Sequence, residues 1–438
     1  MAKIALFCLD VIGKAMAGPA IRYWEFAKEL SKRHQVALII PNKTEQISSD
    51  FLIIDRFSRH YISHLMAADI IIAQQITPSI AFLSKMCKGH IILDAYDPMP
   101  LENLEVFKHM PMGVRVHKNN TILEQFRFSF HMADAVLCAN EHQRSLWLGM
   151  IIALGRLTPQ GYDCNQLMEQ MIDIVPFGLS STPPSGNQGA LRQRFGLCAK
   201  DKVVLWGGGI WNWFDPLSLI RAIKILSDQR GDIKLVFMGV KHPNDSVPEM
   251  KMAREAVALA RDLDLFDKKV FFNFDWVPYE ERQSYLLDAD VGASIHYEHL
   301  ETRFAFRTRI LDYIWSTLPI VATTGDCFAE LIAEKQLGIV VPYGDPLSIA
   351  AAISEIVDDD QRRLAMRANL MAIRPLFHWE RVIAPIEAMI HQLQAKATTF
   401  SLRSFASIVR SFYYHRGPTA IFKALQMKLA LRKEAEHG

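Results

Sequence analysis

Residues 301–326 carry the side chains with the clearest chemistry in this chain. Arg307 and Arg309 stand two positions apart, just before an apolar stretch that predicts a helix. Cations are unfavourable at a helix N-terminus unless an anion compensates them, whereas the helix dipole and the free backbone amides favour an anion there. The segment Arg307, Thr308, Arg309 therefore predicts a phosphate-binding site. Asp312, on the same helix, can accept hydrogen bonds from a ribose, so a nucleoside diphosphate is the expected ligand.

Two glycine-rich turns follow predicted strands and offer backbone amides to a ligand. Gly207–Gly209 come directly after the apolar run Val203–Trp206, and Gly18 lies in the turn after the first apolar run of the chain. A glycine lets the backbone approach a ligand closely, since no Cβ intervenes. We expect Gly208, Gly209 and Gly18 to contact the ligand, although tight turns alone also explain these glycines. Aromatic residues occupy the place of the third glycine of Gly-x-Gly-x-x-Gly, which disfavours nicotinamide or flavin binding.

Charged side chains mark three further places near expected strand ends. Asp97 follows the strand Ile91–Leu93, where a carboxylate can accept hydrogen bonds from sugar hydroxyls or act as a base; capping of the turn is the alternative. Lys241 supplies a cation after a later strand. Glu301 lies in a segment with two histidines, another glutamate and an arginine, which is a weak metal pattern, and an ion pair with Arg303 is the simpler explanation. No metal site is expected.

The composition excludes several classes of protein. The 438 residues contain 49 Lys and Arg against 47 Asp and Glu, whereas a protein that coats nucleic acid would be strongly basic. Six cysteines without a Cys-x-x-Cys pair indicate neither a disulfide framework nor a zinc site. The N-terminal apolar run is too short for a signal peptide, and no stretch reaches the roughly 18 to 20 apolar residues of a membrane-spanning helix. We therefore expect no nucleic-acid partner, and a location in the cytoplasm or peripherally on the inner face of the membrane.

Short β-rich runs alternate with helical patterns along most of the chain. Runs that are apolar on both faces and are separated by helices predict parallel strands of an α/β sheet. The expected strands are 4–9, 36–40, 70–73, 91–93, 135–138, 202–206, 233–239, 270–273, 291–295 and 320–323. A turn-rich segment around 174–184 interrupts this rhythm. The pattern predicts two doubly wound α/β domains facing a cleft, over residues 1–175 and 176–376, with a returning helix over 377–398.

The last forty residues, 399–438, differ from the rest. They hold seven Lys or Arg and two Glu, with apolar residues at helical spacing on both sides of Gly417-Pro418. This pattern predicts a tail of two basic amphipathic helices. The tail either packs on the protein or contacts an anionic membrane surface.

The order of these features resembles a known family. The N-terminal glycine turn, Val-Pro-Phe-Gly at 175–178, the strand followed by three glycines, and Leu-Asp-Tyr-Ile-Trp-Ser-Thr-Leu-Pro-Ile-Val at 311–321 are similar to the GT-B glycosyltransferases of family 4. The resemblance covers residues 1–395 and is most specific over 270–345. It implies two Rossmann-like domains, with a nucleotide-sugar donor held by the second and an acceptor held by the first. It also implies transfer with retained configuration and without metal or another cofactor, because helix N-termini and cations stabilise the leaving diphosphate.

The chain departs from the family's pattern where charge is handled. The family's two glutamates stand eight positions apart; the second corresponds to Asp312 and the first to Phe304, which carries no carboxylate. Glu301, or Glu298, is the expected replacement. The Arg and Lys that follow the family's glycine turn are both missing from the corresponding positions.

These departures, set beside the resemblance, imply roles for the candidate residues. Arg307, Arg309 and Lys241 are expected to neutralise the diphosphate, and Gly18 to contribute a backbone amide. Asp97 is expected to contact the transferred sugar or the acceptor, and with Glu301 to form the catalytic pair. The expected function is a hexosyltransferase-type reaction that moves a sugar from a nucleotide-sugar to a glycan or lipid-linked acceptor. A sugar-nucleotide epimerase on the same fold and a catalytically degenerate partner subunit are the alternatives.

Overall fold

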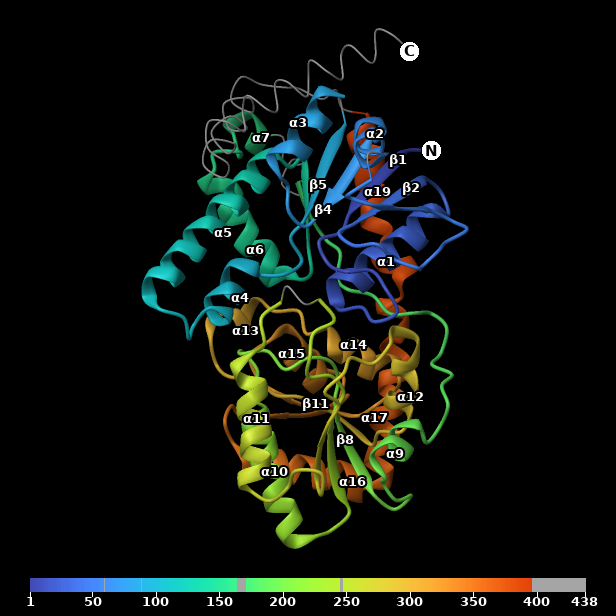
Figure 1. The fold of residues 1–438 in the computed structure, drawn as a ribbon, viewed down its shortest axis with the longest axis vertical. Helices are drawn as coiled ribbons and strands as arrows, with labels where there is room; N and C mark the ends of the chain where they lie inside the picture. Colours follow the sequence, from blue (N-terminus) through green and yellow to red (C-terminus); the bar gives the residue numbers. More distant parts are fainter. Residues whose placement is uncertain (59, 88, 164–170, 245–246, 396–438) are drawn as a thin grey trace.

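The chain forms two α/β domains stacked along the long axis of the molecule (Figure 1). This computed structural model describes residues 1–58, 60–87, 89–163, 171–244 and 247–395. The predicted amphipathic tail, 399–438, and the last three residues of the predicted returning helix, 396–398, lie outside the described residues.

In the described part of the N-terminal domain, seven parallel strands form one sheet in the order β3-β2-β1-β4-β5-β6-β7. The strands are β1 (Lys3–Phe7), β2 (Gln35–Ile40), β3 (Leu52–Asp55), β4 (Ile70–Ala73), β5 (His90–Asp94), β6 (Ala135–Cys138) and β7 (Ile172–Ile174). The helices are α1 (Gly18–Ser31), α2 (His60–Ala67), α3 (Pro78–Met86), α4 (Met99–Val106), α5 (Met112–Met132), α6 (Glu141–Ala153) and α7 (Pro159–Asp163). Every residue of β4, which reads Ile-Ile-Ile-Ala, is buried, as expected for a central strand covered by helices on both faces.

The C-terminal domain repeats this architecture with six parallel strands among the described residues, in the order β10-β9-β8-β11-β12-β13. The strands are β8 (Lys202–Trp206), β9 (Ile233–Phe237), β10 (Val270–Phe272), β11 (Val291–Ser294), β12 (Ile320–Thr323) and β13 (Gly338–Val341). The helices are α9 (Ala190–Phe195), α10 (Pro216–Gln229), α11 (Lys251–Asp262), α12 (Arg282–Leu287), α13 (Leu300–Phe304), α14 (Thr308–Trp315), α15 (Cys327–Glu334), α16 (Pro346–Asp358) and α17 (Asp360–Ile373). In both sheets the strand order reverses direction beside the first strand, which places a crevice at the carboxyl ends of the strands.

Two passages of the chain between the domains lie side by side. The Leu179 N–H donates to the Phe377 carbonyl at 2.8 Å, and the Trp379 N–H donates to the Leu179 carbonyl at 3.1 Å. A Cβ added to Gly178 would lie 2.4 Å from the Trp379 indole, so only glycine fits this close approach. The two passages therefore form one short, hydrogen-bonded connection.

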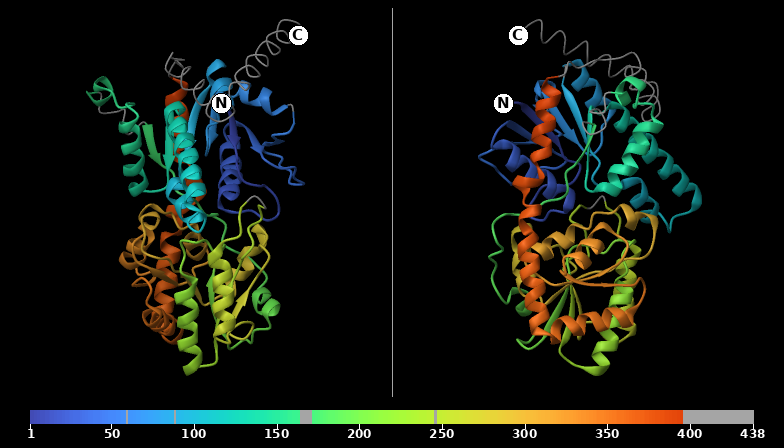
Figure 2. Two further views of the ribbon diagram at one scale, coloured as in Figure 1. Left: turned by 60° about the vertical axis from the view of Figure 1, so that its left-hand side comes forward. Right: turned by 180° about the vertical axis from the view of Figure 1, so that it is seen from behind.

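After the second passage, the chain returns to the N-terminal domain (Figure 2). Helices α18 (Trp379–Val382) and α19 (Ala384–Gln394) bury apolar side chains in the same core as α1. Where they meet, His34 Nε2 lies 2.8 Å from Glu387 Oε2. The C-terminal end of the described chain thus stabilises the first domain.

The predicted fold class is confirmed: two parallel, doubly wound α/β sheets face each other. Among the described residues, no helix is both long and apolar enough to cross a bilayer.

Candidate functional site

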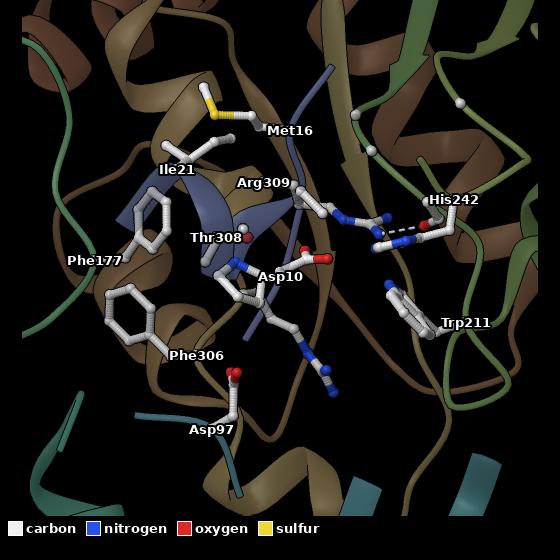
Figure 3. A pocket seen from close by; sticks show the side chains of 18 of the residues that line it. Asp10, Met16, Ile21, Asp97, Phe177, Trp211, His242, Phe306, Thr308 and Arg309 are labelled. Carbon is white, nitrogen blue, oxygen red and sulfur yellow. Dashed lines mark hydrogen bonds between the residues drawn. The ribbon is translucent and has the colours of Figure 1, made fainter. Parts of the chain in front are cut away.

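A cavity of about 460 Å³ lies between the two domains, at the carboxyl ends of both sheets. Asp10, Gly18 and Asp97 line it from the N-terminal domain, and Trp211 and Arg309 from the C-terminal domain. Figure 3 shows the side chains of both domains around this one cavity. Several residues that the sequence predicted near strand ends, from both domains, therefore lie around one cavity.

The glycine turn after β8 forms one wall of the cavity. The Gly207 N–H donates to the Tyr313 hydroxyl at 2.8 Å, and Gly208 has a φ of +79°, a conformation that favours glycine. A Cβ on Gly207 would lie 3.3 Å from the ring and hydroxyl of Tyr313. The predicted residues Gly208 and Gly209 both line the cavity. Tyr313 thus anchors the turn against α14.

Arg309, in the first turn of α14, is a buried cation at this wall. Its Nη2 donates to the Gly209 carbonyl at 2.9 Å, and its guanidinium lies 4.4 Å from the ring centre of Trp206 and 4.0 Å from that of Phe214. The residue is only 8% exposed, and Nη1 has no hydrogen-bond partner in the described part of the chain. Burial lowers the pKa of the Arg309 guanidinium to about 9. Such a cation needs an anion, and the cavity is where one can approach.

Arg307 also lines the cavity, but its charge is already compensated. Its Nη1 and Nη2 donate to the two carboxylate oxygens of Glu301 at 2.8 and 2.7 Å, and its Nε lies 3.8 Å from Asp326 Oδ2. Burial lowers the pKa of Arg307, but the neighbouring carboxylates, Glu301 foremost, outweigh it and raise the pKa overall. The two predicted arginines therefore differ: among the described residues, carboxylates pair with Arg307 but none pairs with Arg309.

Two predicted site residues do not reach the cavity wall. Glu301, expected in the catalytic pair, is buried behind the wall, with both carboxylate oxygens bound to Arg307. Lys241 is also absent from the wall, because the chain turns away after β9 and presents His242 there instead. The sequence could not separate these two residues from those that line the cavity, because position along the chain does not fix the direction of a side chain.

Asp312 and Thr308 lie where the sequence placed them, on the cavity side of α14. Arg282, which the sequence did not single out, donates from Nε to Asp312 Oδ1 at 3.2 Å. Burial raises the pKa of Asp312, while the Arg282 charge opposes that rise. The Arg282 guanidinium also lies 3.8 Å from the ring centre of Tyr279, which holds it in place.

The N-terminal wall contributes backbone amides and carboxyl groups. Gly18 begins α1, and Pro19 follows it, so the start of this helix is preset and faces the cavity. Asp97 is half-buried, and burial raises its pKa to about 7, with the nearby Asp94 charge adding to the rise. Glu102, on α4, lines the same wall, and burial raises its pKa well above the ordinary value, with the Asp97 charge second.

Several lining residues escaped the sequence reasoning. Asp10 follows β1 and accepts from Asn244 of the other domain at 2.9 Å, while its second carboxylate oxygen is buried without a hydrogen-bond partner in the described part of the chain. Its position after the first strand is a signal that could have identified it. Trp211 and Trp276, by contrast, are residues for which the sequence allowed either a cleft or a core position; they line the cavity on either side of His242, with ring centres 5.6 and 5.4 Å from the imidazole. Glu102 and Arg282 sit on helices and carried no such signal.

Residues 201–359 match the family model described as glycosyl transferases group 1. D-inositol 3-phosphate glycosyltransferases are similar to part of the chain. That of Xylanimonas cellulosilytica is 24% identical over 222 residues, covering 49% of each chain, and that of Corynebacterium kroppenstedtii is 27% identical over 212 residues, covering 48% of this chain and 45% of the relative. The chain thus spans about half the length of the curated relatives it matches.

Solved structures match most of the chain in fold. HepE of Anabaena, crystallised with UDP and glucose, has a TM-score of 0.62 at 15% identity, covering 90% of this chain and 100% of that one. Sucrose-phosphate synthase of Thermosynechococcus elongatus also has a TM-score of 0.62, at 16% identity, covering 90% of this chain and 99% of that one. Together, the family match over residues 201–359 and the fold of both domains agree with the resemblance: the chain has the GT-B fold, and its second domain is similar to the group 1 glycosyl transferases.

Proposed function

We propose that this protein is a glycosyltransferase that moves a sugar, with retention, from a nucleotide-sugar donor to a glycan or lipid-linked acceptor. One observation carries the proposal: the buried Arg309 guanidinium faces an interdomain cavity, and its Nη1 has no hydrogen-bond partner in the described part of the chain. A diphosphate supplies the missing negative charge. The family match and the two-domain fold support this choice of ligand.

The donor diphosphate would lie between the glycine turn and the start of α14. Arg309 would donate to a phosphate oxygen from Nη1 while Nη2 keeps its bond to the Gly209 carbonyl. The free amides at the start of α14, together with Thr308, would bind the same anion. When the sugar–phosphate bond breaks, these groups would stabilise the charge that develops on the leaving diphosphate.

The remaining assignments follow from position along the cavity. Asp312, held by Arg282, would accept hydrogen bonds from the ribose hydroxyls. On the opposite wall, Gly18 and Asp97 would contact the transferred sugar or the acceptor hydroxyl. Lys241 and Glu301 stay outside this proposal because neither lines the cavity.

The test is calorimetry of the full chain with UDP, followed by incubation with nucleotide-sugars and product analysis by mass spectrometry. UDP is the first probe because HepE, a structure of the same fold, is described in complex with UDP-glucose. Binding of UDP and transfer to a glycan or lipid-linked acceptor are the expected results. An epimerised nucleotide-sugar without acceptor would replace the proposal with an epimerase, and failure to bind any nucleoside diphosphate would favour a degenerate partner subunit.

A further inference from the structure

The turn between α4 and α5 exposes apolar side chains that no other part of the described chain covers. We call residues 104–118 the α4–α5 tip. Leu104, Met110, Met112, Val114 and Val116 are each between 39% and 65% exposed. The views in Figures 1 and 2 show the start of α5 projecting from the side of the N-terminal domain, near the junction with the other domain. Clustered exposed apolar side chains of this kind mark interaction surfaces.

The two halves of α5 have different environments. In the second half, Phe126, Phe128, Phe130 and Met132 are buried in the core beside Trp147. None of the buried residues of this helix lies in its first half, within the described structure. The second half therefore anchors the helix, and the first half is held away from the core with its apolar side chains in solvent.

The tip is mainly basic: it carries three Lys or Arg side chains and one carboxylate, that of Glu105 near its start. Between residues 106 and 123 the chain contains no Asp or Glu, whereas Lys108, Arg115 and Lys118 lie there. Lys108 Nζ donates to Glu105 Oε2 at 3.0 Å, just outside this interval. Lys118 Nζ lies 5.5 Å from the ring centre of Phe107, so its stem folds back along the tip. Cations that border exposed methionine and valine side chains complement an anionic surface.

The tip is continuous with the wall of the cavity. Met99, Glu102, Asn103 and Val106 of α4 line the cavity, and the tip begins on the same helix. Asn212 of the C-terminal domain donates to the Val106 carbonyl at 3.5 Å, which fixes the end of α4 against the loop that follows the glycine turn. A surface that binds the tip would therefore lie close to the cavity.

We propose that the α4–α5 tip binds an anionic lipid bilayer, with Met112, Val114 and Val116 in the headgroup region and Arg115 and Lys118 against lipid phosphates. Apolar residues interspersed with cations on a projecting element fit a bilayer interface, whose surface adapts to a convex shape. A protein partner is less suited, because binding hot spots are usually aromatic or arginine side chains in a well-packed central pocket. The proposal does not depend on the donor chemistry, and it places a lipid-linked acceptor beside the cavity.

The experiment is flotation of the full chain with phosphatidylcholine vesicles, with and without about 30% phosphatidylglycerol. Met112→Gln/Val116→Gln removes apolar contact without changing charge, and Arg115→Gln/Lys118→Gln removes two cations. Leu347→Gln/Leu364→Gln is the matched control, since these two leucines are 69% and 66% exposed on the other domain. Thermal unfolding and UDP binding, measured without vesicles, verify that each variant keeps its fold.

We expect the wild-type chain and the control to float with the anionic vesicles. Each cation near an anionic surface strengthens partitioning roughly fivefold, so the double charge variant should partition roughly 25-fold more weakly. The apolar variant should lose at least about tenfold. Flotation of both tip variants at the wild-type level would overturn the proposal and point to another surface, such as residues 399–438. An equal loss in the control, or equal binding to neutral vesicles, would overturn it as well.

Discussion

Replacing Arg309 by Met should have opposite effects on ligand binding and on stability. Arg309 is buried, its Nη2 binds the Gly209 carbonyl, and it contacts the Trp206 and Phe214 rings, but none of these groups carries a negative charge. Without a ligand, this cation therefore lies in an apolar site where no described residue supplies a counter-ion. A methionine preserves much of the stem volume and removes the charge.

The magnitudes follow from the surroundings of Arg309. The lowering of its pKa from 12.5 to about 9 corresponds to about 5 kcal/mol of unfavourable interaction with the charged form. Against this, the variant loses the bond to Gly209, worth about 1.5 kcal/mol, and two ring contacts of about 1 kcal/mol each. The ligand-free variant should thus be more stable by about 1 to 2 kcal/mol. A diphosphate that loses its charge-assisted bonds to Arg309 should bind about 2 to 3 kcal/mol more weakly, roughly 30- to 160-fold in Kd.

The assays are urea unfolding without ligand and calorimetry with UDP. Arg307→Met is the matched control, because it removes the neighbouring guanidinium and leaves Glu301 buried without its cation. This control should lose about 3 kcal/mol of stability. An Arg309→Met variant that binds UDP with wild-type affinity would refute the assignment of the anion site. A variant that is less stable than the wild type would refute the inference that Arg309 is an uncompensated cation.

Three further predictions concern single positions. Glu301→Gln should cost about 3 kcal/mol of unfolding free energy, because it removes the carboxylate that holds Arg307; the exposed Glu298→Gln, measured alongside in urea, should cost little. In the native state the Asp97 carboxyl keeps its proton up to about pH 7, whereas in the unfolded chain this carboxyl loses its proton near pH 3.8. The free energy of unfolding that Asp97 contributes therefore falls as pH rises between these two values. Asp97→Asn should therefore gain stability relative to wild type from pH 4 to pH 8 in urea titrations, and a constant difference would contradict this. Thr317 has a φ of +53°, which is strained for a β-branched residue, so Thr317→Gly should raise the free energy of unfolding in urea by about 1 kcal/mol, whereas Thr317→Ala, which keeps a Cβ, should not.

Much of the fold could be predicted because central parallel strands are apolar on both faces. The expected strands 70–73, 135–138 and 320–323 coincide with β4, β6 and β12. Strand β3 was missed: it lies at the edge of its sheet, where Leu52 is exposed, and its apolar run, 51–54, is short. The start of α5 was missed for a related reason: its apolar residues do not recur at helical spacing, since they face solvent and not a core.

The site could be predicted only as far as local sequence determines it. The sequence showed that residues 307–309 stand at the start of one helix and that the glycine turn 207–209 precedes another helix. The parallel topology then brings these two segments together at one edge of the sheet. Which arginine stays available is decided by the side-chain contacts that the fold creates around each one. Arg307 precedes the first helical residue and points toward Glu301 and Asp326, two carboxylates that compensate it, whereas Arg309 points toward Gly209, a hundred residues earlier, which offers only a carbonyl. A carbonyl accepts a hydrogen bond but cancels no charge, and the aromatic rings beside it exclude water. The anion site therefore exists because the fold places the Arg309 guanidinium where no carboxylate of the described chain pairs with it. Residue spacing alone cannot distinguish two arginines that stand two positions apart.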